Sequence, residues 1–197
     1  MKKMVLILLS FVLTVSCITT NSNNSNSNIK NSNNSEASQL QYDVEFFVGQ
    51  GWTEDTVRAG LPESVEYLLF KNGTTIEDSE VALTIAHRLL PAGVTLEQFA
   101  TYQQTQMFRA YQNANCRYTH DRWDAYGTTT PSGTFDQYLS ARTIIVDDQG
   151  QETFQKLIYI RVESDIFLIA FVSRNINELD DEKLKLIIGT LVFSRKS

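Results

Sequence analysis

The chain contains two histidines, and His120 lies close to carboxylates in the sequence. His120, Asp121 and Asp124 are residue types that bind metal ions or supply a base for hydrolysis. Adjacent residues of a strand point to opposite faces of a sheet, so these three side chains cannot easily converge on one ion. We therefore expect no metal site and no catalytic residue here. A hydrolase built around His120 and Asp124 is the alternative, and it would need a deep polar pocket that holds both side chains.

The remaining titratable residues form no catalytic pattern. The sequence has no GxSxG, P-loop, GxGxxG or HExxH motif, and its carboxylates are scattered over expected turns and helix starts. His87 falls on the apolar face of an expected strand, which predicts a hydrogen-bonded histidine of the core. We expect a protein that is not an enzyme and that carries no cofactor.

Two cysteines are present, Cys17 and Cys116. Neither belongs to a CxxC pair or to a Cys/His pattern with zinc spacing. A free cysteine usually behaves as a small hydrophobic residue, so we expect Cys116 to be a buried thiol. An intermolecular link through Cys116 is the alternative.

One segment is rich in the residues that dominate binding surfaces. Tyr118, Arg122, Trp123 and Tyr126 stand next to a Gly/Thr/Pro loop at residues 127–133. Tyr, Trp and Arg are enriched in binding hot spots because they bury a large area at modest entropic cost. The alternative is that these aromatic residues complete the core, since a strand places half of its side chains inside. We predict a binding surface formed by these four residues.

The charge of the chain excludes one class of partner. The 197 residues carry a formal net charge of −6. Nucleic-acid binding depends on neutralising phosphates with Lys and Arg, so an acidic chain is a poor candidate for it. An electrostatic patch for a membrane surface is disfavoured for the same reason.

The N-terminus predicts export. Lys2 and Lys3 precede a nearly unbroken apolar run at residues 4–15. As a helix, this run would span only about 18 Å, whereas the hydrocarbon core of a bilayer is about 30 Å thick. We therefore expect residues 1–16 to be a cleaved signal peptide and not a permanent membrane span.

The residues after the apolar run resemble the bacterial lipobox. Ser16 and Cys17 match that pattern, and Thr14 replaces the usual aliphatic residue. The resemblance implies cleavage before Cys17 and lipidation of its thiol and amino group. Two or three acyl chains hold a protein stably on a membrane. We expect a lipoprotein on the extracytoplasmic side of a bacterial cell envelope, attached to the membrane through Cys17.

The next segment is predicted to be a tether. Residues 21–35 comprise eight Asn, five Ser, one Ile and one Lys. This composition cannot bury enough apolar surface to offset the entropic cost of ordering. We expect a disordered segment over residues 17–38, followed by a single globular domain over residues 39–197.

The domain shows mostly strand patterns. Tyr42, Val44, Phe46 and Val48 alternate with polar residues, as in a strand with one buried face. Asn72-Gly73 predicts a hairpin turn. The expected strands cover residues 42–48, 64–71, 80–90, 117–126, 136–146, 152–162 and 166–172. The last of these is continuously apolar, which indicates a central strand covered on both faces.

Two longer helical patterns interrupt the strands. Thr95 and Gln98 fit a capping box at the start of a helix that extends to about residue 113. Asn177 is expected to cap a final helix with an apolar inner face. A shorter helical turn is expected at residues 53–58, capped by Thr53. Together these elements predict an α+β fold, with an antiparallel sheet of six or seven strands covered by helices.

Several segments resemble the PsbP/DcrB-like superfamily. They are Gly51-Trp52, residues 93–97 (GVTLE), the hairpin of the last two long strands, and residues 186–193 (LIIGTLVF). The resemblance covers about residues 42–193 and implies an α/β/α sandwich without a shared catalytic set. It also implies a role as an envelope lipoprotein or a protein-binding adaptor.

The resulting functional prediction is a non-catalytic module of the cell envelope that binds or assembles with an envelope protein. Two alternatives come from other classes. One is the hydrolase described above. The other is a carrier of an apolar small molecule, which would need a large internal cavity between sheet and helix.

Overall fold

A computed structural model describes residues 40–55, 64–126 and 137–197. The predicted signal peptide, Cys17, the tether and the loop at residues 127–133 lie outside these residues. The elements of the described chain are β1 Tyr42–Glu45, β2 Trp52–Glu54, β3 Val65–Lys71, β4 Val81–Leu89, α2 Leu96–Asn113, β5 Arg117–His120, β6 Asp124–Tyr126, β7 Gln137–Val146, β8 Glu152–Val162, β9 Asp165–Ser173, the 3₁₀ helix η1 Ile176–Leu179, α3 Asp181–Gly189 and β10 Val192–Arg195.

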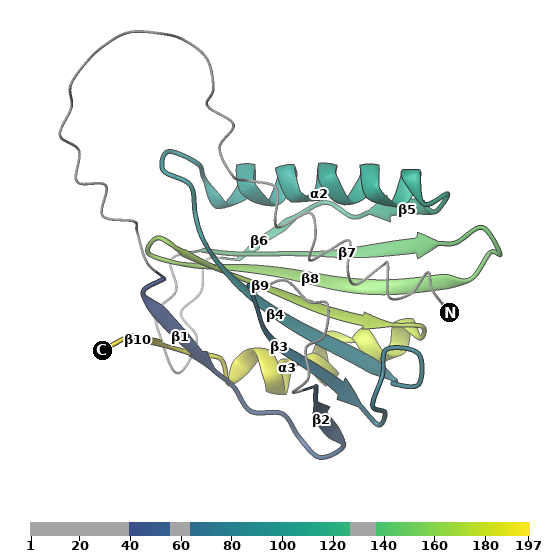
Figure 1. Cartoon of the computed structure of the whole chain (residues 1–197), viewed down its shortest axis with the longest axis horizontal. Helices are drawn as coiled ribbons and strands as arrows, with labels where there is room; N and C mark the ends of the chain where they lie inside the picture. Colours follow the sequence, from purple (N-terminus) through teal and green to yellow (C-terminus); the bar gives the residue numbers. More distant parts are fainter. Residues whose placement is uncertain (1–39, 56–63, 127–136) are drawn as a thin grey trace, which may run out of the picture.

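One antiparallel sheet dominates the fold (Figure 1). Its strand order is β2-β3-β4-β9-β8-β7-β5, and β6 pairs with β7 beyond the end of β5, as the eighth strand among the described residues. β1 and β10 form a separate two-stranded sheet. The predicted α+β class is confirmed. β9 lies between β4 and β8 with every residue buried, which confirms its prediction as a central strand.

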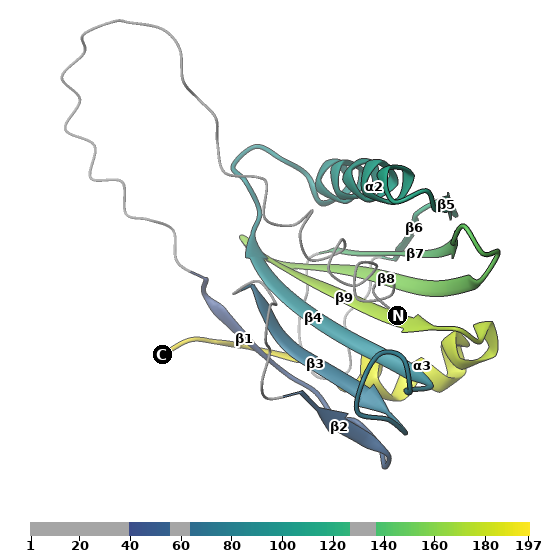
Figure 2. The same cartoon turned by 45° about the vertical axis from the view of Figure 1, so that its right-hand side comes forward.

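Each face of the sheet has its own apolar layer. Along β9, Leu168 and Ala170 face α2, whereas Phe167 and Ile169 face α3 and the β1–β10 pair. This alternation follows from the two-residue period of a strand. Helices α2 and α3 therefore cover opposite faces, as Figure 2 shows from the side. No helix of the described chain is long and apolar enough to span a membrane.

Helix α2 begins as predicted. The Thr95 hydroxyl accepts from the Gln98 N–H at 3.2 Å, and the Gln98 side chain accepts from the Thr95 N–H at 2.9 Å. This reciprocal pair satisfies two N–H groups that a helix start leaves open. The buried face of α2 consists of Leu96, Phe99, Ala100, Gln103, Met107 and Tyr111. Gln103 on this face was not predicted.

Two helix-start predictions are wrong. Thr53 lies in strand β2, opposite Phe70 of β3, and so does not start a helical turn. At the C-terminal end, Asn175 caps η1 and Asp180 caps α3, whereas Asn177 lies inside η1. At Thr53, pairing with a distant strand overrides the local capping signal, whereas at the C-terminal end two other nearby residues supply the caps.

The strand boundaries also differ in part. β1 ends at Glu45, and its partner β10 was not predicted. The β3–β4 connection is longer than a two-residue turn, because Lys71 pairs with Val81. The Asp78 carboxylate organises this loop by accepting hydrogen bonds from the N–H groups of Thr74 and Thr75, at 2.9 and 2.7 Å.

Candidate binding site between helix α2 and strand β5

The predicted strand over residues 117–126 is broken into β5 and β6. His120 pairs with Thr143 of β7, and Asp124 pairs with Ser140 of β7. Between these pairs, the three residues 121–123 lie opposite the two residues 141–142 of β7. The extra residue makes this a β-bulge, which re-aims the side chains within it. As a result, the Trp123 side chain packs against the core layer under α2, whereas the Arg122 side chain is exposed.

Aromatic rings form a continuous row from α2 across β5 to β8. The Tyr111 and Tyr118 rings are stacked with centroids 5.2 Å apart, and His120 lies 6.2 Å from Tyr118. Trp123 meets His120 at 4.6 Å and Tyr159 at 5.2 Å, both in T-shaped geometry. Such edge-to-face pairs contribute about 0.5–1.5 kcal/mol each beyond their area burial. The row therefore holds β5 and the bulge against the helix.

A groove lies between α2 and β5 beside this row. Its volume is about 410 Å³, and it is lined by Gln104, Thr105, Phe108, Tyr118 and His120. Phe108 is 48% exposed, so its ring offers apolar surface at the groove. The groove thus combines an exposed aromatic ring with amide, hydroxyl and imidazole groups. This mixture is typical of a binding site in which apolar contact provides area and polar groups provide orientation.

Several buried polar atoms around the groove have no hydrogen-bond partner among the described residues. They are the hydroxyls of Tyr118 and Tyr159, Nε2 of His120, Nε1 of Trp123, and both side-chain polar atoms of Gln103. An unsatisfied buried polar group costs about 1–3 kcal/mol. Native proteins leave few such groups, and here they gather within one layer. These atoms are themselves shielded from solvent, so they lie behind the groove surface and do not face it.

These groups are neutral at pH 7. Burial raises the pKa of the Tyr118 and Tyr159 hydroxyls above the usual tyrosine range. Burial lowers the pKa of His120 below its ordinary value of 6.5, although contacts with Asp121 oppose the shift. The imidazole is thus largely uncharged, with one nitrogen able to donate and the other able to accept.

The structure brings two of the four predicted binding residues together. Tyr118 lines the groove and Trp123 lies behind it, whereas Arg122 is exposed and does not line it. The side chain of Tyr126 lies outside the described residues. Phe108, Gln104 and Thr105 were not predicted, although the exposed apolar Phe108 on a polar helix face is a signal that could have found them.

The geometry does not support the hydrolase alternative. The rings of Tyr118 and Trp123 contact His120, and Asp124 is exposed and does not line the groove. Among the described residues, no group of three His, Cys, Asp or Glu could hold a metal ion. The apolar-carrier alternative gains no support from the groove, because its lining is mixed and not predominantly apolar.

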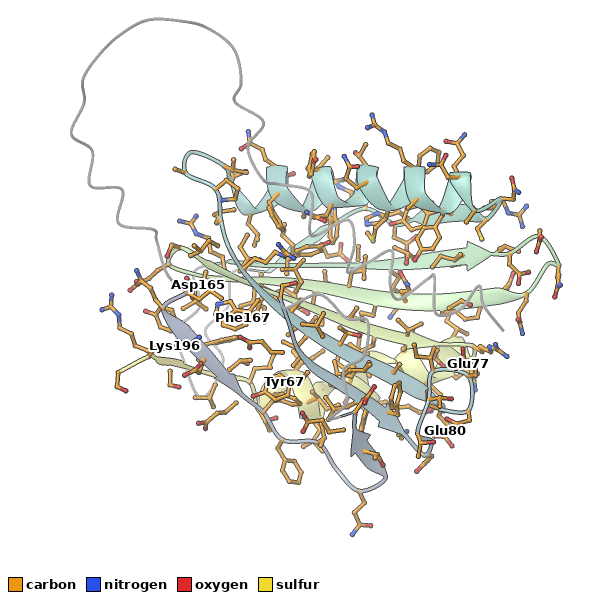
Figure 3. All side chains as sticks on the ribbon, in the orientation of Figure 1. Tyr67, Glu77, Glu80, Asp165, Phe167 and Lys196 are labelled. Atoms are coloured by element: carbon orange, nitrogen blue, oxygen red, sulfur yellow. The ribbon has the colours of Figure 1, made fainter. Side chains whose placement is uncertain are left out.

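The second histidine belongs to the core, as predicted. His87 is 1% exposed, with Nδ1 3.0 Å from Glu66 Oε1 and Nε2 2.8 Å from Asp165 Oδ2. Its ring stacks on Phe167 at 4.1 Å. Figure 3 shows Asp165 and Phe167 together beside β1. Because carboxylates engage both ring nitrogens, His87 cannot act as a base toward a nucleophile.

Two further features lie outside the groove. Cys116 lies just after the end of α2 and is half-buried against the core layer, so the thiol is not fully buried as predicted. A smaller depression of about 160 Å³ lies between α3 and the β2–β4 region. The Lys71 ammonium crosses it to Glu178 at 3.2 Å, so its charges are already paired.

No protein-family model and no curated protein matches the chain. Among solved structures, the chain is similar to cyanobacterial PsbP (CyanoP) from Synechocystis sp. PCC 6803, with a TM-score of 0.54 and 8% identity over 82% of this chain and 96% of that one. A crystal structure from Bacteroides thetaiotaomicron matches with a TM-score of 0.47 and 11% identity, over 81% of this chain and 50% of that one, and we draw nothing from it. The similarity to CyanoP shows that the chain has a PsbP-like fold.

Proposed function

We propose that the protein is a non-catalytic binding module of a bacterial cell envelope, attached by lipid at Cys17, and that it holds an envelope protein in the groove between α2 and β5. The observation that carries this proposal is the groove itself. It presents the exposed Phe108 ring beside the side chains of Gln104, Thr105, Tyr118 and His120, so apolar surface and polar groups lie together.

The sequence supports the attachment. The apolar run is too short to span a bilayer, and Cys17 follows it at the position of a cleavage site. The 21 residues from 18 to 38, treated as a coil, have a root-mean-square span of about 25 Å and a maximum reach of about 70 Å. The domain would therefore reach partners at some distance from the membrane surface.

The absence of catalysis is inferred from the two histidines. His87 is enclosed by two carboxylates, and His120 packs between aromatic rings. Among the described residues, no hydrogen bond joins either imidazole to a hydroxyl or a thiol. The PsbP-like fold alone does not decide function, because function depends on the site.

Site-specific photo-crosslinking tests the binding surface. A photo-reactive amino acid at Gln104 samples the groove, and one at Phe47 samples the opposite side, where Phe47 is 59% exposed next to α3. We expect irradiation of intact cells to give a discrete protein adduct at Gln104 and none of the same mass at Phe47. Equal adducts at both positions, or none at Gln104, would contradict the proposal.

The attachment has its own test. Cys17→Ala, or treatment with globomycin, should leave an unprocessed precursor. Unchanged mature size and membrane association after either treatment would show that Cys17 is not lipidated.

A further inference from the structure

Strand β5 ends the large sheet and leaves one edge open. β5 pairs with β7 on one side, and no strand of the described chain lies on its other side. An open edge of a sheet presents unpaired N–H and C=O groups to any extended chain that approaches. The register shows which groups these are.

The outward-facing residues of β5 are Tyr118 and His120. The Asp121 N–H donates to the Arg142 carbonyl of β7 at 3.0 Å, so the odd-numbered residues of this segment direct their backbone groups toward β7. In an antiparallel pair the direction alternates, and the even-numbered residues point away. Cys116 agrees with this, because its N–H donates to Tyr111 of α2 at 2.8 Å and not to β7.

The open edge and the groove are parts of one surface. Tyr118 and His120 supply the outward backbone groups, and their side chains also line the groove against α2. A strand added to β5 would therefore lie alongside α2 and would place every second side chain in the groove. There, Phe108 offers apolar contact, and the side chains of Gln104 and Thr105 offer hydrogen-bonding groups.

The charged residues near the groove indicate which kind of peptide segment would bind there. The 23 residues from Gln98 to His120 contain no Asp or Glu and two arginines, Arg109 and Arg117, although the whole chain has a net charge of −6. Both arginines are exposed: Arg109 follows the groove residue Phe108 on α2, and Arg117 lies at the start of β5, on the face opposite to Tyr118. A neutral or acidic segment is therefore favoured over a basic one.

We infer that the partner of the groove is an extended, neutral-to-acidic peptide segment of another protein, which pairs with the outer edge of β5 as an added strand beside α2. This inference rests on the proposed function and specifies its partner class. Main-chain hydrogen bonds give such complexes affinity, and the alternate side-chain pockets give specificity.

Two variants at one position separate backbone pairing from side-chain contact. His120→Ala removes the imidazole but keeps the outward N–H, whereas His120→Pro removes both. In the Gln104 crosslinking assay, we expect His120→Ala to retain about half of the adduct or more. We expect His120→Pro to reduce it about tenfold, the effect of an unmade hydrogen bond. Equal adduct from the two variants would overturn the inference and leave the proposed function standing, whereas no adduct in the wild type would overturn both.

A second measurement uses the wild-type backbone, in case His120→Pro folds poorly. In the purified Gln104 adduct, amide exchange of Tyr118 and His120 should be slowed about tenfold or more relative to the free chain. The amide of Thr119, which already faces β7, serves as the internal control and should change little. Unchanged exchange at Tyr118 and His120 in the adduct would overturn strand addition.

Discussion

Asp165 offers the sharpest test of how the N-terminal end of the domain is held. Its carboxylate is fully buried, and one oxygen, Oδ2, accepts from the backbone N–H groups of Gln41 and Tyr42 at 2.8 and 3.0 Å. The same oxygen lies 2.8 Å from Nε2 of His87. Asp165→Ala removes all three contacts at once and leaves a buried imidazole nitrogen without its partner.

The expected cost follows from these contacts. An unpartnered buried nitrogen on His87 costs about 1–3 kcal/mol, and the two backbone N–H groups lose a charged acceptor but can in part be hydrated. Asp165→Ala removes three contacts of one fully buried carboxylate together, so the expected cost exceeds that of a single unpaired group. We expect Asp165→Ala to lower the free energy of unfolding by about 4 kcal/mol and the melting temperature by about 10 °C.

The assay is urea unfolding followed by tryptophan fluorescence, with two comparison variants. Asp165→Asn keeps an oxygen that can accept from the backbone N–H groups, and it should lower the free energy of unfolding by about 1–2 kcal/mol. Asp147→Ala is the matched control, because Asp147 Oδ1 also accepts two backbone N–H groups, at 2.9 and 2.8 Å, but in an exposed turn. We expect it to cost less than about 1 kcal/mol. If Asp165→Ala costs no more than Asp147→Ala, the reasoning is refuted.

The remaining predictions concern the groove. Tyr159→Phe removes a buried hydroxyl without a described partner, so urea unfolding should show equal or higher stability. Trp123→Ala removes a ring that packs on Tyr159 and should cost about 2–4 kcal/mol in the same assay, whereas Trp123→Phe should cost less than half as much. Phe108→Ala, at a half-exposed position, should cost less than about 1 kcal/mol and yet abolish the Gln104 adduct. Burial lowers the pKa of folded His120 below 6.5, so the unfolded chain binds the proton more readily than the folded chain. The free energy of unfolding, measured relative to that of His120→Gln, should be constant above pH 6.5 and should decrease as the pH is lowered through and below that value. A pH-independent difference between the two proteins would contradict the last expectation.

The sheet could be predicted because its strands carry strong local patterns. β9 is apolar throughout, which indicated a strand covered on both faces before its neighbours were known. The capping box of α2 could also be predicted, because Thr95 and Gln98 interact within one helical turn. β10 was missed because its four residues directly follow α3 and find their partner β1 about 150 positions earlier in the chain.

The site was predicted only in part, for a different reason. Tyr118 and Trp123 could be identified by residue type. The bulge that directs the Trp123 and Arg122 side chains differently arises from the register with β7, which local sequence patterns do not reveal. The groove itself requires α2 to lie beside β5, and no pattern within either element specifies that. Asp165 lies just before the strand expected over residues 166–172, and the N–H groups that donate to its carboxylate belong to residues more than 120 positions away.

The pairing of β1 with β10 has a consequence for orientation. Tyr42 lies opposite Arg195, so the two ends of the domain leave the molecule side by side. Both views show this end of the sheet away from β5 and the C-terminal end of α2 (Figures 1 and 2). With a flexible tether to Cys17, as proposed, the domain can turn relative to the membrane, so the groove is not held in one direction. A tag added at the C-terminus would lie beside the start of β1 and leave the groove free.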